Sequence, residues 1–151
     1  MKKSFYFLLT AFLIINFTGA AFSASVNTNK FIQDLGSNDM EKIKIAQKQL
    51  LLLGKDAVPP LIKALENENT QIRGYAAVIL GMMRAEDAVD KLIESLKDKS
   101  SSVRVSAIWA LGEIRNKKAK KSVEEIYKNT SGLEKLSSTV TLIHLGQPEK
   151  I

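Results

Sequence analysis

The sequence of 151 residues lacks cysteine and contains a single histidine. Without cysteine the chain cannot form disulfides, thiolate metal sites, a cysteine nucleophile or a cysteine-linked lipid anchor. The one histidine, His144, excludes a metal site built on a histidine pair, and its place between Ile143 and Leu145 indicates a structural residue in the last helix. No motif places a serine beside a histidine and a carboxylate, and no phosphate-binding glycine loop is present. The sequence therefore predicts no enzymatic activity, no catalytic residues, no metal and no cofactor.

Charged residues are missing from the beginning of the chain after an initial pair of lysines. Residues 5–15 are almost entirely apolar, and the small residues of the stretch GAAFSAS follow them. This order of basic, apolar and small residues is typical of a secretory signal. We predict that residues 1–23 are a signal peptide removed after its last residue, so that the mature protein is exported to a bacterial periplasm or to the medium. Cleavage after Ala21 or Ser25 is an alternative, and so is an uncleaved membrane anchor, because residues 5–22 approach the minimum length of a membrane span.

The excess of basic residues is small once this segment is removed. Lysine and arginine number 22 against 16 acidic residues, which gives a formal charge of +6, and loss of the two leading lysines lowers it to +4. A mildly basic, exported protein gives no reason to expect a nucleic-acid partner.

The rest of the chain consists of three related segments, AQKQLLLLGKDAVPPLIKAL from Ala46, AAVILGMMRAEDAVDKLIESL from Ala76 and AIWALGEIRNKKAKKSVEEIY from Ala107. Their starting alanines are 30 and 31 residues apart. Apolar columns recur within each segment at steps of three and four, which is helical spacing. The columns are Ala46, Ala76 and Ala107; Leu50, Leu80 and Leu111; Leu53, Met83 and Ile114; Ala57, Ala88 and Ala119; Leu61, Leu92 and Val123; and Leu65, Leu96 and Tyr127. Each segment therefore predicts a helical hairpin.

A single hairpin cannot bury both of its faces, so successive hairpins must stack into one core. We predict an all-α, right-handed α-solenoid of antiparallel helical hairpins in residues 24–151, with about eight helices. Its full repeats are expected at about 38–67, 68–98 and 99–130. Capping half-repeats are expected at 28–37 and 132–146, because KFIQDL and STVTLIHLG each repeat half of the pattern.

Polar residues and glycines predict where the helices end. Asn38, Thr70 and either Ser101 or Ser102 are the expected N-caps, Pro59 suits the first turn of a second helix, and Gly54 suits a helix end. Gly81 and Gly112 instead fall inside helices, where a small residue admits a neighbouring backbone.

The segment IRGYAAVILGMMRAEDAVDKLIESLKD resembles HEAT repeats, specifically the short bacterial HEAT-like type also found in phycobilisome lyases. The resemblance extends over about residues 31–146 and implies a scaffold for protein–protein contacts rather than a particular activity. It also implies that Arg73 and Arg104 form a ladder with acidic or carbonyl groups of a neighbouring turn, near Glu66, Glu68 or Asp98. The sequence departs from the pattern at Ile43, which replaces the ladder arginine, and at Lys120 and Glu124, which replace the apolar residues Val58 and Ile62 of the first unit.

Two surface features are candidate partner-binding sites. Trp109 lies about 200° around its helix from Ala107, so with Val105 and Val78 it predicts an exposed apolar patch. Burial of the indole by an adjacent helix or by the terminal segment is the alternative. A basic run, made of Arg115, Lys117, Lys118, Lys120 and Lys121, is interpreted either as a solvated loop or as a contact for an anionic surface.

Together these features predict a small exported scaffold that binds a protein or peptide on its stacked helices. One alternative is an envelope module that makes a weak contact with anionic lipid or polymer through residues 115–121. The other, by analogy with the lyases, is an accessory or chaperone-like HEAT protein.

Overall fold

A computed structural model describes residues 27–146 of the chain, and this range contains helices and turns without a strand. The predicted signal peptide, residues 1–23, lies outside the described residues. A helix over residues 27–34 is followed by α2 (Met40–Leu53), α3 (Val58–Ala64), α4 (Thr70–Met82), α5 (Val89–Ser95), α6 (Ser101–Ile114), α7 (Lys120–Asn129) and α8 (Gly132–Gly146). Short 3₁₀ turns at Gly54–Ala57, Glu86–Ala88 and Lys117–Ala119 join the two helices of each hairpin.

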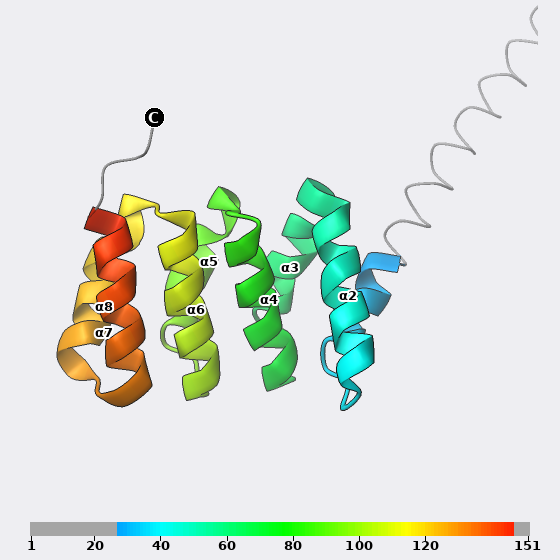
Figure 1. Cartoon of the computed structure of the whole chain (residues 1–151), viewed down its shortest axis with the longest axis horizontal. Coiled ribbons are helices and arrows are strands. Elements are labelled where there is room, and N and C mark those ends of the chain that lie inside the picture. Colours follow the sequence, from blue (N-terminus) through cyan, green and yellow to red (C-terminus); the bar gives the residue numbers. More distant parts are fainter. Residues whose placement is uncertain (1–26, 147–151) are drawn as a thin grey trace, which may run out of the picture.

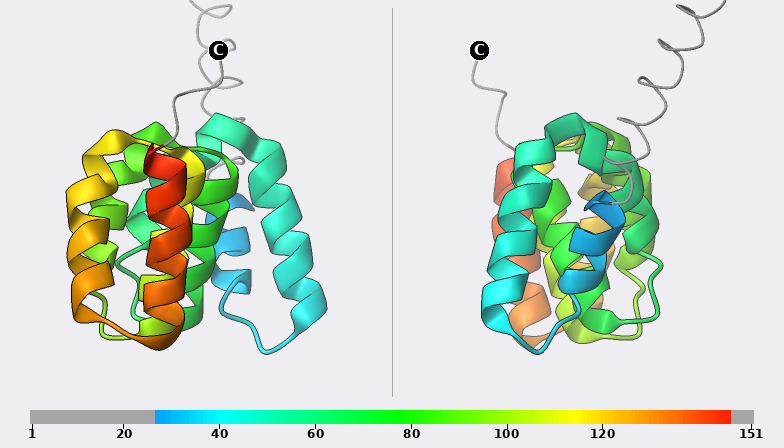
Figure 2. Two further views of the ribbon diagram at one scale, coloured as in Figure 1. Left: turned by 60° about the vertical axis from the view of Figure 1, so that its left-hand side comes forward. Right: turned by 90° about the vertical axis from the view of Figure 1, so that its right-hand side faces the viewer.

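The helices form two layers that follow the repeat (Figure 1). Helices α2, α4, α6 and α8 run side by side in one layer, and residues 27–34, α3, α5 and α7 form the other (Figures 1 and 2). We call these the first-helix layer and the second-helix layer. Three hairpins are thus flanked by one helix at each end of the described chain, which confirms the predicted α-solenoid.

The core lies between the two layers and is built from the predicted columns. The alanines and leucines that begin each repeat are all fully buried, namely Ala46, Ala76, Ala107, Leu50, Leu80 and Leu111. Leucines from the second-helix layer complete it, with Leu61 and Leu92 also fully buried. Alanine lets neighbouring helices approach each other, whereas leucine fills the space between the two layers. The alanine and leucine columns together therefore set the thickness of the core.

Glycine sets the spacing within the first-helix layer. A Cβ atom placed on Gly81 of α4 would lie 2.7 Å from the Cα of Ala110 in α6, and one on Gly112 of α6 would lie 3.4 Å from the Cα of Thr141 in α8. The predicted role of both glycines is confirmed. In α2 the equivalent residue is Leu51, and α2 stands away from α4 (Figure 2). The space left between these two units is a groove of about 630 Å³.

The predicted N-caps are wrong by one residue in each hairpin. Asp39, not Asn38, caps α2, and its Oδ1 accepts hydrogen bonds from the backbone N–H groups of Glu41 and Lys42. Asn69, not Thr70, caps α4 through a 2.8 Å bond from the N–H of Gln71.

The cap of α6 is Ser100 rather than Ser101 or Ser102, and its side chain makes no capping bond. Several polar residues precede each helix, and only the last one with extended backbone can be the cap, which composition alone does not decide. Gly54 does end α2, with φ of 58°, and Pro59 lies in the first turn of α3, as predicted.

Candidate functional site

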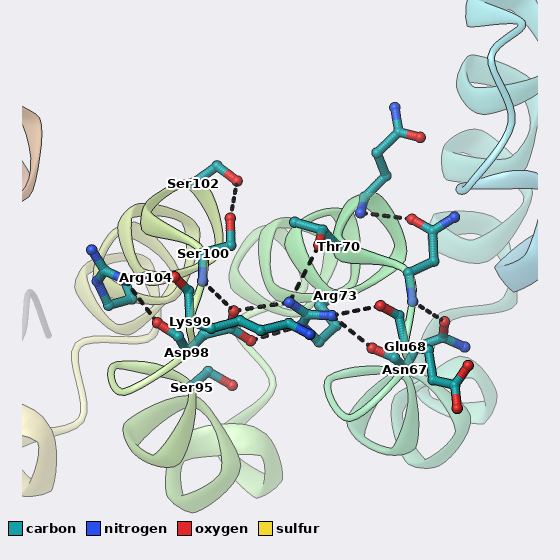
Figure 3. Close-up of polar contacts among 12 residues, drawn as sticks. Asn67, Glu68, Thr70, Arg73, Ser95, Asp98, Lys99, Ser100, Ser102 and Arg104 are labelled. Carbon is teal, nitrogen blue, oxygen red and sulfur yellow. Dashed lines mark hydrogen bonds and ion pairs between the residues drawn. The ribbon is translucent and has the colours of Figure 1, made fainter.

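Two arginines at equivalent positions link successive units, as the resemblance implied (Figure 3). Arg73 of α4 is 5% exposed. Its Nε and Nη2 donate to the two carboxylate oxygens of Asp98 at 2.7 and 2.9 Å, and its Nη1 donates to the carbonyls of Asn67 and Glu68. The Arg73 guanidinium holds the pKa of Asp98 below its ordinary value, and the N–H of Ser100 assists.

Arg104 repeats this arrangement one unit later. Its Nη2 and Nε donate to the carboxylate of Glu134 in α8 at 2.5 and 3.2 Å, and its Nη1 donates to the carbonyls of Asp98 and Lys99. The side chain of Arg104 is 26% exposed, so this rung is nearer to solvent. Of the acidic residues expected near the ladder, Glu66 pairs instead with Lys91. Both arginines are therefore used by the fold and are not available to a partner.

The predicted patch around Trp109 does reach the surface, on the outer face of the first-helix layer. Trp109 is 38% exposed, and Val78 and Val105 are half-buried. The Cζ3 atom of the indole would lie 3.0 Å from a Cβ atom placed on Gly81 of α4. The indole therefore lies across the neighbouring helix. One part of the ring packs on α4, and another part faces solvent. The exposed patch and the buried indole, which were alternatives in the sequence, are thus both present in part.

The structure extends this patch onto α8 with residues that the sequence analysis did not single out. Leu133, Leu136, Val140 and Ile143 are 74%, 63%, 45% and 56% exposed. They follow each other at steps of three, four and three, so they form one stripe along the helix. Leu133 shares a groove of about 480 Å³ with Val105 of α6.

The signal for these residues was present in the repeat. Leu136 and Val140 follow Val105 and Trp109 by 31 residues, which is the spacing between Gly81 and Gly112. Extending the columns of exposed residues, as well as those of core residues, would have found them. We call the combined set the outer apolar surface, and it consists of Val78, Val105, Trp109, Leu133, Leu136, Val140 and Ile143.

The basic run does not form a single patch. Arg115 ends α6 and, with Lys117, lines a groove of about 730 Å³. Lys118 pairs with Asp90 at 2.5 Å, and Lys120 and Lys121 are exposed in the first turn of α7. The run is therefore divided between a groove, an ion pair and a helix start.

The described residues show no constellation suited to metal binding. Between residues 27 and 146, no group of three or more histidine, aspartate or glutamate side chains could hold a metal ion. His144 is half-buried in the last turn of α8. The same range includes no helix with the length and hydrophobicity needed to cross a membrane.

Comparison with known structures places the fold among lyase-like solenoids. A chain of the complex of CpcE and CpcF of phycocyanin lyase from Nostoc sp. PCC7120 superposes with a TM-score of 0.74 and 25% identity, over 80% of this chain and 79% of that one. An engineered protein superposes with a TM-score of 0.53 and 20% identity, over 78% of this chain and 62% of that one.

Sequence comparison gives a family but no curated relative. No curated protein matches the sequence. The family model described as HEAT repeats matches residues 58–141, which is more than half of the chain and includes both ladder arginines. The chain is therefore a member of the HEAT-repeat family.

Proposed function

We propose that this protein is a small exported scaffold that binds a protein partner on its outer apolar surface. The exposed stripe on α8 carries the proposal, because four large apolar side chains on one helix of a small protein have no use in the core. HEAT repeats and the likeness to a chain of a two-protein complex support a role in protein–protein contact. Export rests on the sequence of residues 1–23.

The shape of the surface favours a helical partner segment. The α8 stripe and the neighbouring Val105 and Trp109 of α6 offer two parallel rows of apolar side chains. An amphipathic helix that presents residues at steps of three and four can lie between such rows. Trp109 of α6 lies between Val78 of α4 and the stripe on α8, and an aromatic anchor inside such a surface contributes most to binding.

Trp109→Ala is expected to weaken capture of the partner roughly 30-fold, which corresponds to loss of a hot spot worth about 2 kcal/mol. The measurement is crosslinking and pull-down from the native envelope, followed by titration of the recovered protein. Tyr127→Ala is the matched control, because Tyr127 is also 38% exposed but lies on α7 in the other layer. Equal losses in both variants would argue against the outer apolar surface as the binding site.

The single tryptophan also reports on the surface directly. Acrylamide is expected to quench Trp109 fluorescence in the free protein, and the bound partner should protect it. A strongly blue-shifted, unquenchable emission in the isolated protein would contradict the proposal.

A second candidate function is suggested by the likeness to the phycocyanin lyase chain: an accessory role in attaching a small group to a partner protein. An absorbing compound that copurifies with the protein in stoichiometric amount would favour this role. Recovery of one unmodified protein partner would favour the scaffold.

A further inference from the structure

One residue in the turn after the first helix of each hairpin has a positive φ. This residue is Gly54 after α2, Arg84 after α4 and Arg115 after α6, with φ of 58°, 50° and 62°. Glycine adopts such a φ freely, whereas the Cβ atom of any other residue crowds its own carbonyl. Two of the three hairpins therefore place an arginine where glycine would be more stable.

The two strained arginines belong to one groove. The turns that follow α4 and α6 lie next to each other along the upper edge of the solenoid (Figure 1). Arg84 and Arg115 line the groove of about 730 Å³ between these turns, together with Lys117. Within residues 27–146, none of these three side chains makes a hydrogen bond or an ion pair. Three cations thus share a groove without a partner in the described fold.

Polar contacts join the turn after α6 to the turn after α4 and to the start of α5. Asn116 donates from Nδ2 to Glu86 at 2.6 Å, and Lys118 pairs with Asp90 at 2.5 Å. The Oδ1 atom of Asn116 also accepts a hydrogen bond from the N–H of Lys118. These bonds order the walls before any ligand arrives, which reduces the entropy lost on binding.

We propose that this groove binds an acidic peptide segment of a protein, with a carboxylate held by Arg84 and Arg115. The planar guanidinium donates two parallel hydrogen bonds to a carboxylate, and two such groups from adjacent turns can hold it from both sides. Glu86 and Glu113 also line the groove. These two carboxylates repel densely charged polyanions, but they can accept hydrogen bonds from the N–H groups of a peptide backbone. The site lies apart from the outer apolar surface and does not depend on it.

The test uses a fluorescein-labelled peptide, Gly-Ala-Asp-Gly-Asp-Ala-Gly, titrated with the full-length protein at low salt. Arg84→Gly and Arg115→Gly are each expected to weaken binding about five- to tenfold, because each removes a charged hydrogen-bond donor. Each is also expected to raise Tm by about 2–4 °C, because glycine relieves the strained φ. A gain in stability together with a loss of binding separates a binding role from a structural one.

Lys121→Ala is the matched control, because it removes a nearby exposed charge that does not line the groove. Unchanged binding in Lys121→Ala and in Trp109→Ala would place the site in the groove, independently of the outer apolar surface. The proposal is overturned if both glycine variants bind the peptide as wild type does, or if their Tm falls. It is also overturned if the Asp→Asn peptide binds equally well, or if inorganic phosphate or phosphatidylglycerol vesicles compete better than unlabelled peptide.

Discussion

Arg73→Ala is expected to lower the free energy of unfolding by about 3–4 kcal/mol, the usual cost of breaking a buried ion pair. Its guanidinium bridges the carboxylate of Asp98, in the turn between α5 and α6, and two carbonyls in the turn before α4. Alanine would leave these acceptors with fewer donors and out of reach of water. For a protein of this size the loss corresponds to a fall in Tm of roughly 10 °C, measurable by circular dichroism.

Two other arginines provide a graded comparison. Arg104→Ala should lower the free energy of unfolding less, by about 1–2 kcal/mol, because the Arg104 side chain is 26% exposed. Water can therefore replace part of the hydrogen bonding that the substitution removes. Arg84→Ala should be nearly neutral, because Arg84 is exposed and its side chain has no hydrogen bond or ion pair among residues 27–146. If Arg104→Ala proved more damaging than Arg73→Ala, burial would not govern the ladder.

The same ion pair predicts how stability depends on pH. Arg73 lowers the pKa of Asp98 in the folded protein, so the unfolded chain binds a proton at a higher pH than the folded chain does. The stabilisation is therefore complete above the unfolded pKa of about 3.9 and is lost as pH falls through the lower folded value. Urea titrations between about pH 5 and pH 2 should show a smaller acid-dependent loss in Arg73→Ala than in wild type.

The fold was predictable because the same pattern of apolar residues occurs in three successive segments of the sequence. A single column such as Ala46, Ala76 and Ala107 is weak evidence, but several columns in register leave few alternatives to stacked hairpins. Helix starts were less predictable, because clusters of polar residues precede each helix. Ser37 and Asn67 accept hydrogen bonds from the N–H groups of Asp39 and Asn69, which are the caps themselves. The extended backbone at Asp39 and Asn69 identifies these two residues as the caps.

The binding surfaces were predictable only in part, because they depend on which side chains meet across units. The repeat alignment located Trp109 outside the core columns, but it did not reveal that the indole extends over Gly81. Likewise, the basic run suggested a local patch, whereas Arg115 shares its groove with Arg84 from the preceding unit. Side-chain contacts between residues about 30 positions apart depend on how neighbouring units stack. The spacing of hydrophobic residues along one helix does not determine these contacts.

Gly81→Ala is expected to destabilise the protein by about 2–3 kcal/mol, although alanine is the better helix former. The added methyl would lie 2.7 Å from the Cα of Ala110, and backbone cannot rotate away as a side chain can. Helices α4 and α6 would have to separate, and the indole of Trp109, 3.0 Å away, would be displaced. Urea denaturation should therefore show reduced stability together with a red shift of tryptophan emission in the native baseline.

Two further glycines test whether this cost arises from packing. Gly74 lies in the same helix, but a Cβ atom there would meet only the Oγ of Ser106, at 3.8 Å. Gly74→Ala should thus stabilise the protein by about 0.5–1 kcal/mol through helix propensity. The effect of Gly112→Ala on stability should lie between these two. Its new methyl meets the Oγ1 of Thr141, which can move because it belongs to a side chain. Movement would, however, disturb the hydrogen bond that this hydroxyl donates to the carbonyl of Ile108. If close approach of the first helices sets the spacing of the units, the three alanine variants should rank from stabilising to most destabilising in the order Gly74, Gly112, Gly81. Similar effects at Gly74 and Gly81 would instead mean that α4 and α6 can move apart at little cost, toward the wider spacing of α2 and α4, where Leu51 takes the place of glycine.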